Sequence, residues 1–191
     1  GIPSYNHSKD EIDLEATTKC IKDNLDLVSK VTVSTEYLKN VFTDTFNFNC
    51  VEVIPNYLPR FIYHFDRKEE LTDNIVKPTV LYAGSSTHYS NKDTGDFNKA
   101  LIDFIKNNID KINFVIIGKI PFFFSDIADK ILCFEPINIL AYPNLLHSIN
   151  ADFIIAPLKE NVFNKCKSNL KYLEACAVGS VMIGSSFADS P

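Results

Sequence analysis

Three lysines at the start of a predicted helix are the residues whose type and spacing most clearly indicate binding chemistry. They lie in residues 161–179 (NVFNKCKSNLKYLEACAVG), a loop and short helix with Ser168 as the expected N-cap. A helix N-terminus is already positive, so Lys165, Lys167 and Lys171 there cost about 0.3–1 kcal/mol each. A docked diphosphate offsets that cost. Solvated surface lysines explain the local pattern equally well, but its position after a predicted strand favours an anion site.

Glu174 lies further along the same helix, on the side that carries Lys167 and Lys171. A carboxylate there can accept hydrogen bonds from both hydroxyls of a ribose or sugar diol. The alternative is an intrahelical ion pair with either lysine, which adds only about 0.2–0.5 kcal/mol. The helix alone slightly favours the ion pair.

Two other loops hold groups suited to ligand contacts. In residues 83–90 (AGSSTHYS), Gly84 permits close approach of the backbone and small hydroxyl residues follow it. This loop lacks the G-x-G-x-x-G of a dinucleotide site, so its signal is weak. Residues 134–137 can present backbone groups to a flat base, with Tyr142 nearby.

A regular alternation of strands and helices positions these loops. We predict strands at 79–84, 113–118, 131–136, 151–158 and 180–185, and helices at 97–109, after Pro121, at 138–149 with a kink or restart at Pro143, and within 161–179. The strands are apolar throughout, which indicates parallel pairing with both faces covered, hence a doubly wound, Rossmann-like α/β sheet. Ligands of such sheets bind at the carboxyl ends of the strands.

The first part of the chain reads as the end of another domain. We predict a helix at 13–29, a strand at 30–35, a helix at 36–42 and a strand at 50–56. Residues 57–78 contain two prolines and a charge cluster without sustained periodicity, as expected of an interdomain connection. We therefore assign residues 1–56 to one domain, 57–78 to the connection and 79–191 to a second domain truncated at its C-terminus.

Composition excludes several classes of protein. A net charge of −5 makes nucleic acid an unexpected partner, and no apolar run approaches the roughly 20 residues of a membrane span. The five cysteines show no zinc-like spacing, so we expect buried free thiols in a reducing cytosol. No signal peptide is visible, and the chain starts without Met, as a fragment of a longer protein would.

Three segments resemble GT-B glycosyltransferases of the family-4 type. VTVSTEYLKNVF followed by VEVIPNYLP is similar to the end of their N-terminal domain, and VLYAGSSTH to the start of their C-terminal domain. The segment ADFIIAPLKENVFNKCKSNLKYLEACAVGSVMIGSS resembles their donor-binding segment, in the F-N-x-C-K-S-x-x-K-x-x-E variant of some O-antigen and rhamnan-type enzymes. The resemblance runs from about residue 30 to residue 187, with the three pieces in the same order.

The resemblance implies roles for individual residues. Glu174 would hold the ribose of a nucleotide, and the diphosphate would meet Lys167, Ser168 and Asn169 from one side and Gly84 and Ser85 from the other. The base would lie near Pro136 and Ile137. The common motif is Glu-x7-Glu, but position 166 is Cys166. Contacts to the transferred sugar would then fall to Asn161, Asn164 or Lys165.

These observations predict a metal-independent glycosyltransferase that moves a sugar from a nucleotide-diphosphate donor to a glycan or lipid-linked glycan acceptor. We expect no cofactor other than this donor substrate, and a cytoplasmic location, with peripheral association at the inner face of the membrane left open. The catalytic residues stay unknown, and the fragment should not turn over alone. A catalytically silent sugar-nucleotide or glycan-binding module, suggested by Cys166, and a GT-B sugar-nucleotide epimerase are the alternatives.

Overall fold

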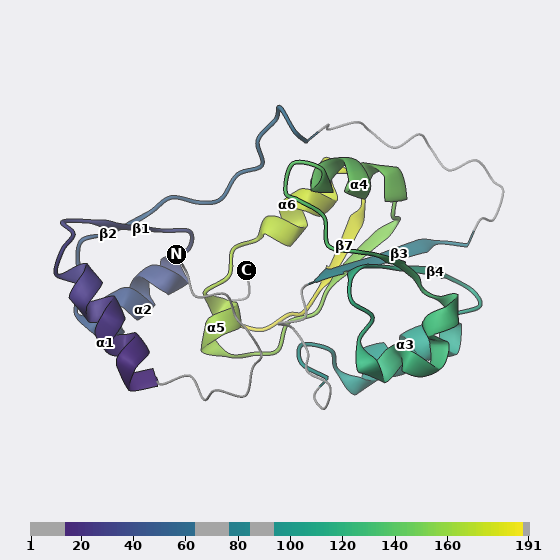
Figure 1. Cartoon of the computed structure of the whole chain (residues 1–191), viewed down its shortest axis with the longest axis horizontal. Helices are drawn as coiled ribbons and strands as arrows, with labels where there is room; N and C mark the ends of the chain where they lie inside the picture. Colours follow the sequence, from purple (N-terminus) through teal and green to yellow (C-terminus); the bar gives the residue numbers. More distant parts are fainter. Residues whose placement is uncertain (1–13, 64–76, 85–93, 189–191) are drawn as a thin grey trace. The chain divides into compact units, whose positions relative to one another are not determined.

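The computed structural model describes residues 14–63, 77–84 and 94–188 of the chain (Figure 1). The chain divides into two compact units. Unit 1 comprises residues 1–56, 161–168 and 188–191, and unit 2 comprises residues 57–160 and 169–187. Residues 161–168, the first part of the predicted lysine-rich loop and helix, therefore group with unit 1. The three-part domain assignment made from the sequence stays a prediction.

Unit 1 contains two short parallel strands and three helices within the described residues. They are α1 (Leu14–Leu25), β1 (Val31–Val33), α2 (Glu36–Phe46), β2 (Val51–Val53) and α5 (Val162–Lys165). Strands β1 and β2 pair in register from Val31↔Val51 to Val33↔Val53. Thr35 is the N-cap of α2, because its hydroxyl accepts a hydrogen bond from the backbone N–H of Leu38 at 3.2 Å.

Unit 2 is built on a parallel sheet, which has five strands in the described part of the chain. The strands are β3 (Thr79–Gly84), β4 (Asn113–Gly118), β5 (Leu132–Phe134), β6 (Phe153–Ala156) and β7 (Val181–Gly184), in the order β5-β4-β3-β6-β7. The helices are α3 (Lys99–Asn108), the 3₁₀ helix η2 (Phe122–Lys130), α4 (Tyr142–Ile149) and α6 (Leu170–Ala177). The direction of winding reverses between β3 and β6, which makes this pair the topological switch point.

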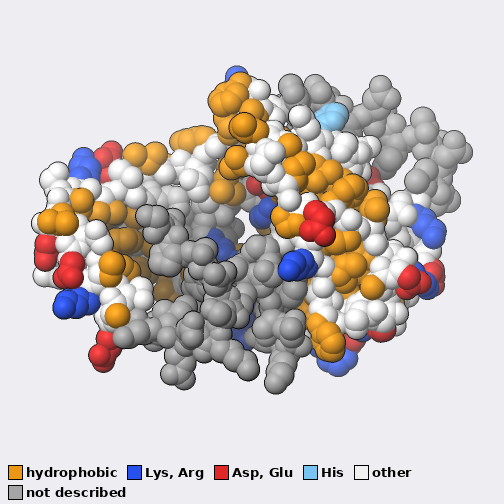
Figure 2. Space-filling view, in the orientation of Figure 1, with side chains coloured by type: hydrophobic (Ala, Val, Ile, Leu, Met, Phe, Trp, Pro, Cys, Tyr) orange, Lys and Arg blue, Asp and Glu red, His pale blue; other side chains and the backbone are white. Residues whose placement is uncertain are grey.

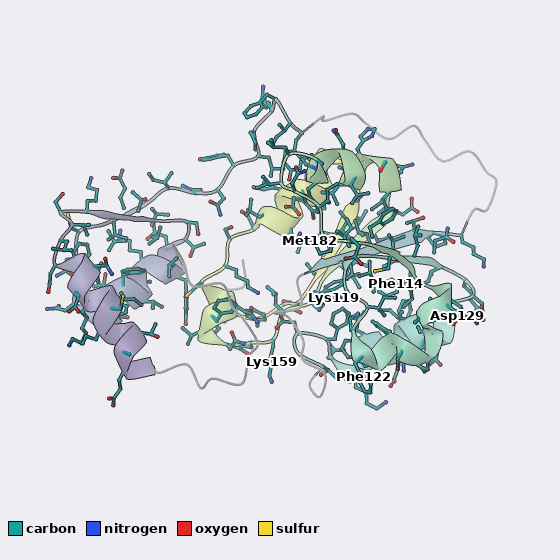
Figure 3. The ribbon with its side chains drawn as sticks, in the orientation of Figure 1. Phe114, Lys119, Phe122, Asp129, Lys159 and Met182 are labelled. Atoms are coloured by element: carbon teal, nitrogen blue, oxygen red, sulfur yellow. The ribbon has the colours of Figure 1, made fainter. Side chains whose placement is uncertain are left out.

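Two apolar cores cover the two faces of this sheet. Leu81 of β3 packs with α4 and α6, whereas the next residue, Tyr82, packs with α3 and η2. Phe114 and Phe124 are buried in the second core, and their ring centroids are 5.5 Å apart. Phe122 is 65% exposed on the same 3₁₀ helix (Figure 3). The sheet is therefore doubly wound, as predicted.

Several local predictions differ from the structure. The helix expected over 138–149 begins at Tyr142, because Asn138 folds the preceding residues into a turn by accepting hydrogen bonds from two backbone N–H groups at 3.0 Å. Pro143 then lies in the first turn, where proline is tolerated. The helix after Pro121 is a 3₁₀ helix.

The cysteines are free, as predicted, but their expected burial is wrong. Cys20, Cys50, Cys133 and Cys176 are exposed, and Cys166 is half-buried. Cys133 lies on the edge strand β5, and Cys176 lies between the buried Ala175 and Ala177, on the solvent side of α6. In the view of Figure 2, the visible lysines and acidic side chains are scattered and do not form one patch.

Candidate functional site

The lysine-rich stretch forms two helices instead of one, so the predicted N-cap at Ser168 is wrong. Asn161 starts α5 by accepting a hydrogen bond from the backbone N–H of Asn164 at 2.8 Å, and α5 ends at Lys165. The second helix, α6, has Asn169 at its N-cap, without a side-chain capping bond. Lys167 therefore precedes α6 and does not share a helical face with Lys171.

The segment that carries Lys167 and Ser168 is held within unit 1 by long-range hydrogen bonds. The Asn56 side chain donates to the Ser168 hydroxyl at 2.7 Å, and Thr35 donates to the carbonyl of Cys166 at 3.2 Å. The ammonium group of Lys167 lies 5.0 Å from the centroid of the Phe163 ring, as in a cation–π contact. Residues far apart in sequence thus fix the backbone between α5 and α6.

The three residues predicted to contact the transferred sugar have different environments. The side chain of Asn161 caps α5, and Asn164 is only 2% exposed. Lys165 is half-buried at the end of α5. A buried amide is generally retained for its internal hydrogen bonds, so these placements favour structural roles for both asparagines. Their assignment to a sugar stays a prediction.

Glu174 belongs to a partly buried polar cluster in unit 2. Its Oε2 accepts hydrogen bonds from the Tyr142 hydroxyl at 3.1 Å and from Nζ of Lys171 at 2.9 Å. Nζ of Lys171 also lies 3.0 Å from the Tyr142 hydroxyl oxygen. The ion pair considered as an alternative for Glu174 is thus present, with Lys171 as its partner.

The tyrosines of this cluster are strongly shifted in pKa. Burial raises the pKa of Tyr142 well above its usual range, and the Glu174 carboxylate raises it further. Burial and the same carboxylate raise the pKa of Tyr63 to about 12. Tyr63 was missed in the sequence because residues 57–78 show no periodicity that would place one of them in a core. Tyr142 was noted only as a neighbour of the base.

The carboxyl ends of β3 and β4 approach each other closely. Gly118 has a φ of +131°, and a Cβ atom there would collide with the carbonyl oxygen of Gly84. The loop after β6 is tied down by hydrogen bonds from Leu158 N–H to the Ser185 hydroxyl at 2.9 Å and from Lys159 N–H to Asp96 at 3.1 Å. The Tyr82 side chain fills the space beside Gly84, so the absence of a side chain at Gly84 is needed for packing within the sheet.

The remaining residues predicted to contact the donor follow strands β3 and β5. Ser85 lies outside the described residues. Pro136 and Ile137 follow β5 and are exposed to solvent. Their proposed contact with a base, like the diphosphate contacts, stays a prediction.

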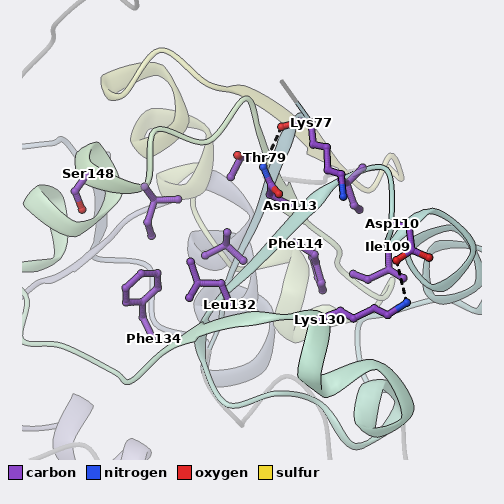
Figure 4. Close-up of a pocket in the computed structure, with 13 residues that line it drawn as sticks. Lys77, Thr79, Ile109, Asp110, Asn113, Phe114, Lys130, Leu132, Phe134 and Ser148 are labelled. Atoms are coloured by element: carbon purple, nitrogen blue, oxygen red, sulfur yellow. Dashed lines mark hydrogen bonds and ion pairs between the residues drawn. The ribbon is translucent and has the colours of Figure 1, made fainter. Parts of the chain in front are cut away.

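A cavity of about 510 Å³ lies at the amino ends of the strands, opposite their carboxyl ends (Figure 4). It is lined by Thr79, Asn113 and Leu132, the first residues of three strands, and by the ion pair between Lys130 and Asp110 at 2.9 Å. Ligands of doubly wound sheets bind at the carboxyl ends of the strands, and of the residues predicted to contact a ligand only Phe134 lines this cavity. We therefore place the candidate site at the carboxyl ends of the strands, and not in this cavity.

The described residues contain no cluster of three or more His, Cys, Asp or Glu side chains that could hold a metal ion. No helix among them is long and apolar enough to cross a bilayer.

The fold is similar to that of known glycosyltransferase structures. A crystal structure of TarM matches with a TM-score of 0.55 at 12% identity, over 94% of this chain and 34% of TarM. A mutant of S. aureus TarM in complex with fondaparinux, α-GlcNAc-glycerol and UDP matches with 0.55 at 14% identity, over 92% of this chain and 34% of that one. The pneumococcal O-GlcNAc transferase GtfA in complex with UDP and GlcNAc matches with 0.53 at 17% identity, over 85% and 31%.

These matches define the class of fold. The parallel α/β architecture matches GT-B glycosyltransferases, which confirms the predicted fold class. The chain spans about a third of the length of the matched structures. No protein-family model matches the chain, and no curated protein matches it in sequence. The family-4 variant suggested by the donor motif stays a prediction.

Proposed function

We propose that the protein is a metal-independent glycosyltransferase that moves a hexosyl or deoxyhexosyl group from a nucleotide-diphosphate donor to a glycan acceptor. The observation that carries the proposal is the position of Glu174 and Lys171 on α6, the second helix after β6, because β6 is one strand of the switch point. The fold match to an O-GlcNAc transferase crystallised with UDP supports the same class of donor.

The proposed chemistry uses the chain's cations to stabilise the leaving group. The bond between the anomeric carbon and the diphosphate oxygen breaks, and an acceptor hydroxyl forms the new glycosidic bond as its proton passes to a base. Lys167 and Lys171, with the N-terminal end of α6, would neutralise the diphosphate as its charge develops. Backbone groups of Ser168 and Asn169, and of Gly84 and Ser85, would contact its oxygens.

The nucleoside end of the donor would be held by Glu174, which accepts hydrogen bonds from the ribose, while Pro136 and Ile137 border the base. We place the reaction in polysaccharide or O-antigen synthesis in the cytoplasm, at the inner face of the membrane where the acceptor is lipid-linked. No cofactor beyond the sugar nucleotide is part of the proposal.

Cys166 favours a second candidate function, a catalytically silent sugar-nucleotide-binding module. The thiol stands where the Glu-x7-Glu motif has its first carboxylate. Burial raises the pKa of the Cys166 thiol, so at neutral pH the position is uncharged and cannot act as a carboxylate does. A donor-hydrolysis and transfer assay on the full-length protein separates the two functions. Binding without turnover, unchanged by Cys166→Glu, supports the silent module and contradicts the transferase.

Lys167→Ala tests the diphosphate site. A lost charge-assisted contact is worth about 1.5–3 kcal/mol, so we expect UDP affinity in calorimetry to fall roughly tenfold or more. The matched control is Lys99→Ala, which removes an exposed lysine that pairs with Asp103 on α3 and should leave affinity unchanged. Equal affinities of the two variants would show that Lys167 does not bind diphosphate and would contradict the proposed lysine site.

A further inference from the structure

Glu174 is held by groups from two helices that cover the same face of the sheet in unit 2. Tyr142 is the first residue of α4, and Lys171 is the second residue of α6. Both donate to the same carboxylate oxygen, Oε2, at 3.1 Å and 2.9 Å. The side chain of Glu174 is 13% exposed and that of Lys171 is 39% exposed. The carboxylate is therefore largely enclosed and oriented by its donors.

The hydrogen bonds of this cluster have one consistent direction. Nζ of Lys171 donates to the Tyr142 oxygen at 3.0 Å, so the Tyr142 hydroxyl must direct its own proton to Glu174. The ammonium also lies 5.3 Å from the centroid of the Tyr142 ring. Because the pKa of Tyr142 is raised by burial and by Glu174, its hydroxyl stays protonated and remains a donor at neutral pH.

The two oxygens of Glu174 are not equivalent. Two donors use the acceptor capacity of Oε2, since a carboxylate oxygen has about two lone-pair sites. Within the part of the chain that the structure describes, Oε1 accepts no hydrogen bond from these donors. A carboxylate oxygen that these donors leave open is suited to receive hydroxyl donors from a ligand.

We propose that Tyr142 is a positioning residue for nucleotide recognition, which with Lys171 fixes Glu174 through Oε2 so that Oε1 receives the ribose hydroxyls. This inference rests on the proposed function, because it takes the ribose of the donor as the ligand of Glu174. It changes one detail of the sequence-based expectation. The diol is bound by one carboxylate oxygen, and the other oxygen is held by the protein.

The test compares a ribonucleoside diphosphate with its 2′,3′-dideoxy analogue in calorimetry on the full protein. The probe is the best binder among UDP, ADP, GDP and CDP. The variant is Tyr142→Phe, which keeps the ring and removes the hydroxyl. The matched control is Tyr172→Phe, the same substitution at an exposed position of α6. Thermal unfolding of both variants checks that they fold.

We expect the wild type to prefer the ribose form by about tenfold or more, since losing the hydroxyl partners leaves Oε1 of the carboxylate without a hydrogen bond. Tyr142→Phe should reduce this preference about three- to tenfold by weakening only the ribose form, and Tyr172→Phe should retain it. A full preference in Tyr142→Phe, or equal weakening of both ligands, overturns the positioning role alone. A wild type without preference, or without binding to any of the four probes, overturns the ribose site itself and this inference with it.

Discussion

Replacing Gly118 with alanine should destabilise unit 2 more than the same substitution at Gly184, which also ends a strand. Gly118 has a φ of +131°, and its added Cβ would meet the carbonyl oxygen of Gly84, a backbone atom that cannot rotate away. The disfavoured backbone conformation costs about 1–3 kcal/mol and the overpacking about 1–3 kcal/mol more. Alanine restricts the unfolded chain, which offsets about 0.4–1 kcal/mol. We expect a net loss of about 2–4 kcal/mol in the free energy of unfolding.

Gly184→Ala is the matched control, because Gly184 also ends a strand of the same sheet. Its added Cβ would meet the terminal methyl of Met182, a flexible side chain that can move. Urea unfolding followed by circular dichroism measures both variants, and the control should stay within about 1 kcal/mol of the wild type. If Gly118→Ala is as stable as Gly184→Ala, the argument from close backbone approach at β3 and β4 is wrong.

Two further predictions concern the cores of unit 2. The free energy of unfolding should fall as pH rises from about 10 to about 12, because the raised pKa values of Tyr63 and Tyr142 let the unfolded state lose these protons first. Tyr63→Phe should reduce the slope of this fall in urea titrations at successive pH values and leave the contribution of Tyr142, and an unchanged slope would refute the assignment. Phe124→Ala should cost about 3–5 kcal/mol in urea unfolding, because its ring is fully buried against Phe114. Phe122→Ala, at a 65% exposed position, should cost about 0.5 kcal/mol or less, and equal losses would contradict the proposed core.

The sheet of unit 2 could be predicted from the sequence because its strands are continuous apolar runs. The predicted strands at 79–84 and 113–118 have the same limits as β3 and β4, since each begins after a polar or proline-containing turn and ends at a glycine. The predicted strand at 151–158 extends past β6, because its last residues bond to other loops instead of a neighbouring strand. Apolar character alone cannot mark where pairing stops.

The candidate site was less predictable, because its geometry depends on distant residues. Periodicity joined residues 161–179 into one loop and helix, whereas the cap at Asn161 and the hydrogen bond from Asn56 to Ser168 separate them into α5 and α6. No local sequence pattern predicts a hydrogen bond between side chains that are 112 positions apart. The pairing of Glu174 with Lys171 was accessible from helix spacing, but the part played by Tyr142 required the packing of α4 beside α6.

The central position of β3 also governs the order in which unit 2 can fold. Strand β3 pairs with β4 on one side and with β6 on the other, and the backbone N–H of Thr79 bonds the Asp152 carboxylate, 73 positions later. Parallel pairing over such separations requires closure of long loops before any contact forms, which slows folding. On the ribosome, β3 and β4 can pair early, but one edge of β3 stays open until β6 has been synthesised. Unit 2 should therefore complete its sheet late, after β6 and then β7 have been synthesised.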